Sequence, residues 1–439
     1  MKGTIVAKEI TKENVIAIIF LLLIIFYLLS ILFNVISASL LVKVFANENQ
    51  KNTRAVEFTK VDWEALYPFE NETSMLINRD GIKNLDKTAE ILKDKVDRFC
   101  TEKLLFRVNF FEMNTTISKL LDRNIIEGSE NVVKMKNGYL TYYNELADVT
   151  ECAEQVIRLK EYAEGSGAKF LYVQYPFKVS KYDDQMPDGV EDYSNENADN
   201  LLKKLLEGGV DTYDFRETIN NKGLDHYSLF FETDHHWKTE TGLWVASELA
   251  ALMNQDYGYN IDTSIYEPNN YDVEVYENWS LGTQGKKVGL SYTDPENISL
   301  ITPKFDTSLQ LQIPSKKVNN EGRFEDVVYN MAEFERIDYY KSSPYDAHLY
   351  ENNAVSLMHN NKVSDGKKML ILKESFSLVV LPYLALGVED IEVLDVRKFT
   401  GSVKTYIKES KPNMVLVMYN PSFITGFEVG EHTHLFDLE

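Results

Sequence analysis

Residues 369–396 read MLILKESFSLVVLPYLALGVEDIEVLDV, and this stretch decides the fold class. MLILK is a short apolar run with the length and composition of a buried strand. ESFS follows as a turn, and LVVLPYLAL is predicted to be a helix with Pro382 in its first turns, where proline is tolerated. IEVLDV predicts a second buried strand. A strand, a helix and a strand in succession are typical of a parallel sheet with helices on its faces.

The same alternation continues on both sides of this stretch. NGYLTYY from residue 137 is predicted to be a strand, Val149–Ala163 an amphipathic helix, and KFLYVQY at 169–175 a buried strand. A helix at 197–207 precedes the strand VDTYDF, and a helix at 401–409 precedes the strand MVLVMY. The sequence therefore predicts an α/β domain with a mostly parallel sheet, covered on both faces, over residues 137–425.

Residues 255–365 interrupt this alternation. They are rich in Asn, Tyr, Asp and Ser and include short alternating segments such as TSLQLQI. Strict alternation of apolar and polar residues predicts half-buried strands. We therefore expect an insertion that contains antiparallel strands and long loops.

The N-terminus predicts a membrane anchor. Val15 to Val42 contains no charged residue, and a helix needs roughly 20 apolar residues to span a bilayer. The run is longer than the about 7–15 apolar residues of a cleaved signal peptide, which is the alternative interpretation. We expect residues 1–45 to form a cytoplasmic tip and a single-pass anchor, with the bulk of the chain extracytoplasmic. Residues 46–136 would form a stalk and accessory helices, and residues 426–439 a tail.

Composition restricts the partners and the chemistry. The net charge of −22 repels nucleic acid, so we expect no nucleic-acid partner. Two cysteines, Cys100 and Cys152, are too few for a disulfide framework or a zinc cage, although one disulfide between them fits an extracytoplasmic location.

One motif carries an acid and two histidines. Asp234-His235-His236-Trp237 precedes apolar residues at helical spacing, so it lies at or just before a helix N-terminus. Histidine serves most readily as a general base near neutral pH, and a nearby carboxylate can hold its tautomer. A helix cap with surface histidines is the structural alternative. A metal site would need further ligands, and no second cluster has suitable ligand spacing.

Ser375 lies in the turn between the strand MLIL and the following helix. There it would be exposed at the edge of the sheet, near helix-start N–H groups that can stabilise an oxyanion. In open α/β sheets, ligands bind beyond the carboxyl ends of the strands, and Ser375 lies at such an end. A serine that only caps a helix is the alternative.

A third segment, VQYPFK, ends a strand at the same predicted edge. Gln174, Tyr175 and Lys178 are therefore expected to point into the cleft and contact substrate, together with Trp237. A buried strand followed by an ordinary loop is the alternative.

In this order, the segments Tyr-Pro-Phe-Lys, Asp-His-His-Trp and Glu-Ser-Phe-Ser resemble the DHHW proteins, which are related to the SGNH-hydrolase-like domains of alginate O-acetyltransferases. The resemblance covers roughly residues 137–425 and implies a three-layer α/β/α sandwich. It assigns the acid to Asp234, the base to His236 and the nucleophile to Ser375, and it gives His235 no catalytic role. The relatives usually carry Gly-Asp-Ser where this chain has Lys373-Glu374-Ser375.

The resemblance implies an extracytoplasmic, membrane-anchored O-acetyltransferase that acts on a cell-envelope or secreted polysaccharide. It also implies a membrane-bound acyltransferase partner that supplies the acyl group. Neither a metal nor a cofactor is expected. Two alternatives remain: an esterase that removes acyl groups with the same three residues, and a non-catalytic polysaccharide-binding protein.

Overall fold

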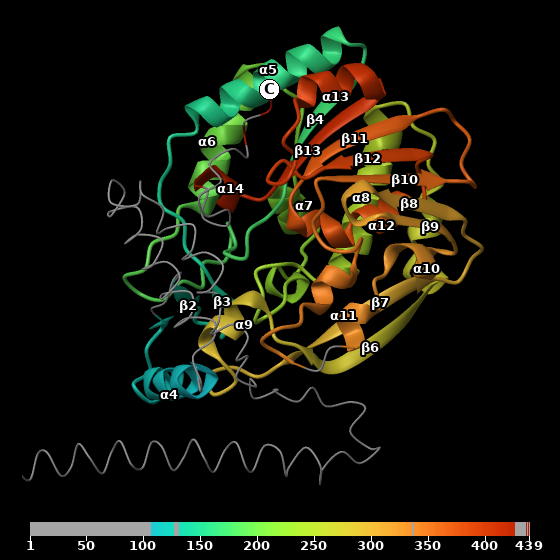
Figure 1. Cartoon of the computed structure of the whole chain (residues 1–439). Helices are drawn as coiled ribbons and strands as arrows, with labels where there is room; N and C mark the ends of the chain where they lie inside the picture. The colour runs from blue at the N-terminus through green and yellow to red at the C-terminus, as the bar shows by residue number, and fades with distance from the viewer. Residues whose placement is uncertain (1–106, 127–130, 336–337, 426–435, 437, 439) are drawn as a thin grey trace, which may run out of the picture. The chain divides into compact units, whose positions relative to one another are not determined.

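The computed structural model describes residues 107–126, 131–335, 338–425, 436 and 438 (Figure 1). The predicted anchor, most of the stalk and accessory helices, and most of the tail lie outside these residues. In the described part of the chain, no helix has both the length and the apolar character needed to cross a bilayer. From Glu112 onward the described residues form one compact unit.

The main sheet has eight strands and is mixed. Its order is β5-β4-β13-β11-β12-β10-β8-β9. The first five strands are parallel to one another, whereas β10, β8 and β9 are antiparallel to their neighbours. The prediction of a mostly parallel sheet therefore applies only to one half. In chain order the strands are β4 (Lys169–Gln174), β5 (Thr212–Asp214), β8 (Leu309–Ile313), β9 (Val318–Gly322), β10 (Val355–Asn360), β11 (Lys368–Lys373), β12 (Asp390–Leu394) and β13 (Met414–Tyr419).

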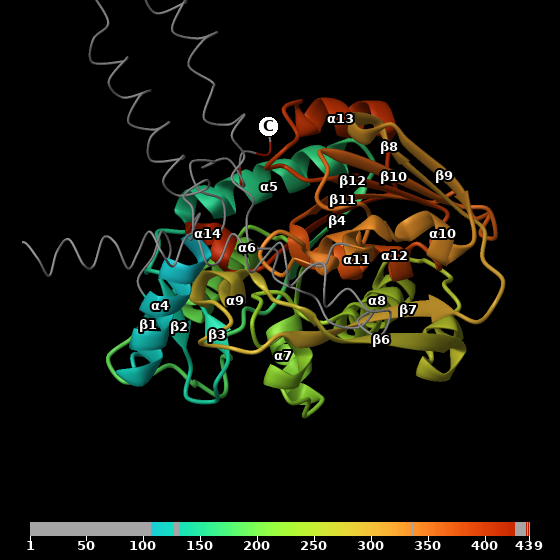
Figure 2. The same cartoon turned by 60° about the horizontal axis from the view of Figure 1, so that its bottom comes forward.

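Helices cover both faces of the parallel half (Figures 1 and 2). Side chains alternate along each strand, so in β4 Phe170 and Tyr172 enter one apolar cluster while Leu171 and Val173 enter the other. One face carries α5 (Thr150–Gly165), α6 (Ser194–Glu207), α13 (Val403–Ser410) and α14 (Ser422–Thr425). The other face carries α7 (Phe215–Asn221), α8 (Thr239–Asp256), the 3-10 helix η10 (Ser375–Val379) and α12 (Leu381–Leu384).

The segment 255–365 is antiparallel, but three of its strands extend the main sheet. β8, β9 and β10 come from this segment, and β6 and β7 form a separate hairpin. The remaining elements are β6 (Tyr271–Ser280), β7 (Glu296–Pro303), α9 (Thr283–Val288), α10 (Phe324–Val328), α11 (Ala332–Glu335), η5 (Tyr227–Leu229), η6 (Thr263–Tyr266), η7 (Pro268–Asn270), η8 (Pro314–Lys316), η9 (Pro344–Ala347) and α4 (Arg107–Leu120).

Two local predictions need correction. The strand predicted at residue 137 is β3 (Leu140–Thr141). It pairs with β2 (Val132–Lys134) in a small sheet that also contains β1 (Ile125–Ile126), and it does not join the main sheet. The single helix predicted for LVVLPYLAL is divided into η10 and the short α12. The proline lies at the start of α12, because its ring and missing N–H suit a first turn better than a helix interior.

A glycine lets α8 lie directly against η10. At Gly242 an added Cβ would be 2.6 Å from the carbonyl carbon of Val379. This close approach brings the N-terminus of α8, which follows the Asp-His-His-Trp motif, up to the helix that begins with Ser375.

Candidate active site

A tight turn presents the Asp-His-His-Trp motif. Phe230 and Trp237 form an isolated antiparallel bridge, and the Phe231 N–H donates to the carbonyl of His236 at 3.1 Å. The chain thus doubles back before α8 begins at Thr239. The motif therefore lies on a closed loop just before a helix, in the position that the sequence predicted.

Asp234 is fixed at both carboxylate oxygens. Oδ1 lies 2.6 Å from His236 Nδ1 and accepts the His236 backbone N–H at 3.0 Å. Oδ2 accepts the N–H of Thr283 at 2.6 Å and its hydroxyl at 3.1 Å. Burial opposes ionisation, but the two histidines and the hydrogen bonds from His236 outweigh it and hold the pKa of Asp234 well below its ordinary value. The carboxylate is therefore charged beside the imidazole.

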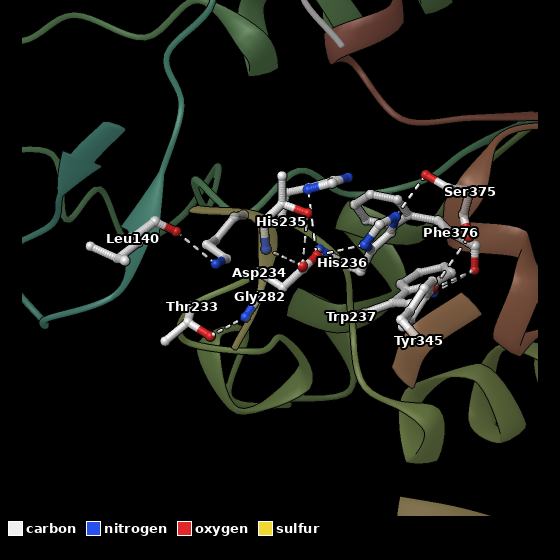
Figure 3. Close-up of polar contacts among 12 residues, drawn as sticks. Leu140, Thr233, Asp234, His235, His236, Trp237, Gly282, Tyr345, Ser375 and Phe376 are labelled. Atoms are coloured by element: carbon white, nitrogen blue, oxygen red, sulfur yellow. Dashed lines mark hydrogen bonds and ion pairs between the residues drawn. The ribbon is translucent and has the colours of Figure 1, made fainter. Parts of the chain in front are cut away.

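Ser375 completes a hydrogen-bonded chain with these two residues. It begins η10, immediately beyond the carboxyl end of β11. Its Oγ lies 2.7 Å from His236 Nε2, across 139 residues of sequence (Figure 3). The predicted closeness of His236 and Ser375 is thus observed, within the distance required of a nucleophile and its base.

The neighbouring histidine takes a different place. The His235 ring lies against the His236 ring, with centroids 3.8 Å apart, and its Nδ1 is 3.4 Å from Asp234 Oδ1. The histidine hydrogen-bonded to Ser375 is His236, through its Nε2.

Glu374 accepts a hydrogen bond from one of the helix-start N–H groups that we expected to stabilise an oxyanion. Its side chain is buried, and Oε2 accepts the N–H of Phe376 at 2.9 Å and lies 3.4 Å from Ser375 Oγ. The expectation that the first N–H groups of this helix face a substrate therefore fails for Phe376. In this conformation its N–H is already bound within the turn.

Lys373, the other unusual residue of the serine turn, is buried in an ion cluster. Its Nζ lies 3.1 Å from Asp395 Oδ2 and also donates to the side chain of Asn352. Arg397 shares Asp395, with Nη2 2.6 Å from Oδ2. The end of β11 is thus anchored by charge just before the serine.

Three of the residues expected to contact substrate are instead buried supports. The amide of Gln174 donates to the carbonyls of Tyr175 at 2.9 Å and Tyr419 at 3.1 Å. The Tyr175 hydroxyl lies 3.1 Å from Ser377 Oγ, and the Trp237 indole N–H donates to the Phe376 carbonyl at 2.8 Å. All three residues are fully buried. Their polar groups hold the serine turn and the neighbouring strands, so direct contact with substrate does not fit the structure.

Lys178, the fourth, is also fully buried. Its Nζ donates to the carbonyls of Leu140 at 2.6 Å and Glu232 at 3.3 Å. Burial lowers the pKa of Lys178 to about 7, against the opposing charges of Glu296, Asp234 and Glu232. Lys178 therefore holds the segment before Asp234 through its hydrogen bond to Glu232, and its side chain is not accessible to a substrate.

Glu296 and Tyr345 are two residues of the site that the sequence did not indicate. Both carboxylate oxygens of Glu296 accept backbone N–H groups, from Glu232 and Thr233, each at 2.7 Å. The Tyr345 ring stacks on the His236 ring, with centroids 4.1 Å apart and planes 16° apart. Both residues lie in the segment that breaks the α/β pattern, where no motif or periodicity pointed to them.

A cavity of about 730 Å³ is lined in part by residues that flank the Asp-His-His-Trp motif. Glu232, Lys238 and Glu296 belong to its mostly polar lining, which includes none of Asp234, His236 and Ser375. Ser375 itself is only 5% exposed. This cavity and the hydrogen-bonded chain are therefore separate features.

Among the residues that the structure describes, two groups of side chains have metal-ligand atoms close together: Asp234, His235 and His236, and a second group of His359, Glu389 and Asp390. In the first group both nitrogens of His236 already face Asp234 and Ser375. The second brings together residues that sequence spacing did not link, but its side chains are partly exposed and His359 already bonds to Asp390 at 2.8 Å. Neither gives a reason to replace the acid–base–serine interpretation.

A serine at the carboxyl end of a parallel strand, joined through histidine to a buried carboxylate, is an acid–base–serine arrangement on an α/β fold. Two family models match this chain: "SGNH hydrolase-like domain, acetyltransferase AlgX" over residues 135–274 and "DHHW protein" over residues 211–394. These matches confirm the resemblance to the DHHW proteins and to the SGNH-hydrolase-like acetyltransferase domains.

Solved structures agree with this fold. Bacillus cereus PatB1 with a sulfonyl adduct has a TM-score of 0.57 at 19% identity, over 71% of this chain and 99% of that chain. A DHHW family protein from Eubacterium siraeum has a TM-score of 0.51 at 16% identity, over 72% of this chain and 97% of that chain. No curated protein matches the sequence. At these identities the likeness shows the fold alone.

Proposed function

We propose that this chain is a membrane-anchored, extracytoplasmic serine O-acyltransferase that transfers acetyl groups to a cell-envelope or secreted polysaccharide. The observation that carries the proposal is the continuous set of hydrogen bonds from Asp234 through His236 to Ser375. A buried carboxylate, an imidazole and a hydroxyl in this order are the parts needed to activate a serine.

The chemistry follows from the orientation of the imidazole. Ser375 Oγ attacks the carbonyl carbon of an acyl donor while His236 Nε2 takes the hydroxyl proton. Asp234 holds Nδ1–H and stabilises the imidazolium. His236 returns the proton to the leaving group, which leaves an acyl ester on Ser375. A sugar hydroxyl then attacks this ester, His236 takes the hydroxyl's proton, and the free serine regains a proton as the acylated sugar departs.

The family comparison supports acetyl transfer. The model that matches residues 135–274 is described as an acetyltransferase domain. The sulfonyl adduct of Bacillus cereus PatB1 suggests a practical reagent, because sulfonyl fluorides modify activated hydroxyl groups. The predicted anchor at Val15–Val42 would keep the domain near a membrane-bound acyltransferase that supplies acetyl groups. The reaction needs neither a metal nor a cofactor.

A chromogenic acetyl ester tests the acylation step. The intact protein and Ser375→Ala are incubated with the ester and analysed by mass spectrometry, followed by peptide mapping. We expect an acetyl adduct on Ser375 in the wild-type chain and none in the variant. The absence of both an adduct and ester turnover, in a folded wild-type protein, would contradict catalysis and favour a polysaccharide-binding protein.

A second measurement separates transfer from hydrolysis. Acetylated protein is mixed with candidate polysaccharides or with buffer alone, and the fate of the acetyl group is followed. Transfer to a sugar hydroxyl supports the acyltransferase, whereas release as acetate at the same rate with and without polysaccharide supports the esterase.

The location has its own test. Protease added to intact cells or right-side-out vesicles should digest the chain beyond about residue 45 and leave a short protected fragment that contains the about 20-residue span. Full protection of the large domain would overturn the proposed topology.

A further inference from the structure

Residues 343–353, here called the strap, have an unusual backbone. After η9 the strap contains three consecutive residues with positive φ: Leu349 at 50°, Tyr350 at 58° and Glu351 at 67°. None is glycine, and a left-handed residue with a side chain costs roughly 1–2 kcal/mol. Such conformations persist only where surrounding contacts determine them, and they gather at functional sites.

One side chain holds this turn in place. The amide of Asn353 donates to the carbonyls of Leu349, Tyr350 and Glu351 at 3.2, 3.1 and 2.9 Å. The N–H of Leu349 also donates to the carbonyl of Val328 at 2.8 Å. These hydrogen bonds therefore fix the backbone conformation of the strap.

The strap carries Tyr345 onto the imidazole of His236. The two rings are nearly parallel at 4.1 Å, and the His235 ring lies 3.8 Å from the same imidazole. Two rings cannot occupy one face of an imidazole at these separations, so His236 is held between His235 and Tyr345 (Figure 3). Rotation of the imidazole about its side-chain bonds is blocked on both faces.

The same tyrosine also reaches the serine turn. Its hydroxyl donates to the carbonyls of Ser375 at 3.3 Å and Phe376 at 3.4 Å. Burial, and then the nearby acids Glu374 and Asp234, raise the pKa of Tyr345 well above its ordinary value, so the hydroxyl stays protonated as a donor. One residue thus contacts the ring of His236 and the backbone of Ser375.

We propose that Tyr345 is a positioning residue that fixes the plane of the His236 imidazole, with Nδ1 toward Asp234 and Nε2 toward Ser375. The proposal rests on the proposed function for its kinetic consequence, but the geometric claim stands apart from it. The stacked ring of Tyr345 restricts the orientation of the imidazole, and its hydroxyl holds the serine turn by hydrogen bonds.

Two substitutions separate the ring from the hydroxyl. Tyr345→Phe keeps the stacked ring, whereas Tyr345→Leu removes it. Tyr266→Leu is the matched control, because Tyr266 is also buried in the same apolar cluster but has no contact with the hydrogen-bonded chain. Folding of each variant is checked by urea denaturation.

The first readout is the rate of Ser375 labelling by phenylmethylsulfonyl fluoride, normalised to the active fraction by titration. We expect Tyr345→Leu to be slower by about tenfold or more, because small misplacements of reacting groups are costly. Tyr345→Phe should restore most of this rate, and Tyr266→Leu should match the wild type per active site. A wild-type labelling rate in Tyr345→Leu would overturn the proposal.

The second readout does not require activity. The proton between His236 Nδ1 and Asp234 should give a downfield resonance in the proton NMR spectrum, identified by its loss in Asp234→Asn. We expect this resonance to be lost or broadened in Tyr345→Leu and retained in Tyr345→Phe and Tyr266→Leu. Its persistence in Tyr345→Leu would overturn the positioning role even if the wild-type serine is never acylated, and failure of acylation alone would count only against the proposed function.

Discussion

Gly242→Ala should separate the proposed base from the proposed nucleophile. The added Cβ would lie 2.6 Å from the carbonyl carbon of Val379, whereas ordinary contact begins at 3.4 Å. Either α8 or η10 must therefore move by at least about 0.8 Å (3.4 − 2.6), because the carbonyl oxygen of Val379 would lie nearer still. Val379 lies four residues after Ser375 in η10, and the hydrogen bond at risk is 2.7 Å long. We expect labelling of the serine to slow by about 100-fold, and stability to fall by about 1–3 kcal/mol from overpacking.

Gly165→Ala is the matched control for this substitution. Gly165 is the last residue of α5, and no heavy atom would lie within 4 Å of its Cβ. We expect it to be neutral or to stabilise the fold by about 0.4–1 kcal/mol. Labelling by phenylmethylsulfonyl fluoride and urea denaturation are measured for both variants. If Gly242→Ala labels and unfolds like the wild type, the close approach of α8 and η10 does not align the site.

Three further outcomes follow from the contacts. His236→Ala should abolish ester turnover while His235→Ala retains most of it, and the reverse result in a chromogenic ester assay would shift the assignment of the base by one residue. The charges of Lys373 and Arg397 outweigh burial and lower the pKa of Asp395 to about 2 from 3.8, so Asp395 stabilises the fold above pH 3.8 and this contribution is lost as pH falls through 2. Asp395→Asn leaves a buried lysine unpaired and should cost about 3–5 kcal/mol in urea denaturation; a change under about 1 kcal/mol would contradict this. Burial lowers the pKa of His348 to about 4 from 6.5. As the pH falls, His348 is therefore protonated in the unfolded chain before it is protonated in the folded one, and its contribution to the free energy of unfolding should fall by about 3 kcal/mol between pH 6.5 and 4. His348→Gln should flatten that part of a stability–pH curve, and an unchanged slope would refute the assignment.

The sequence predicted the parts of the fold that depend on local pattern. The buried runs that became β4, β11, β12 and β13 were continuous and apolar, and the amphipathic stretches at 149–163, 197–207 and 401–409 became α5, α6 and α13. It failed where the arrangement depends on distant pairing. Alternation in TSLQLQI indicated a strand but not its partner, so the extension of the main sheet by β8, β9 and β10 could not be foreseen.

The site shows the same division. Asp234, His236 and Ser375 were assigned their roles because the segments around them resemble the DHHW proteins, whereas their local contexts alone left helix caps as the alternative. Lys178 was assigned to substrate because it follows a strand that ends at the carboxyl edge of the predicted sheet, whereas in the structure its side chain is completely buried. Tyr345 gave no signal, because one aromatic residue in a Tyr-rich segment has no pattern of its own, and only the fold brings its ring to His236.

The position of β13 constrains how the domain can be made. It is the last strand of the described sheet in sequence, yet it lies between β4 and β11. Until residue 419 has been synthesised, β4 and β11 each lack a neighbour, and two unpaired apolar edges remain open. Unpaired edges of this kind promote aggregation of nascent chains. The sheet can therefore close between β4 and β11 only after β13 has been made, although its partner strands are complete earlier in synthesis.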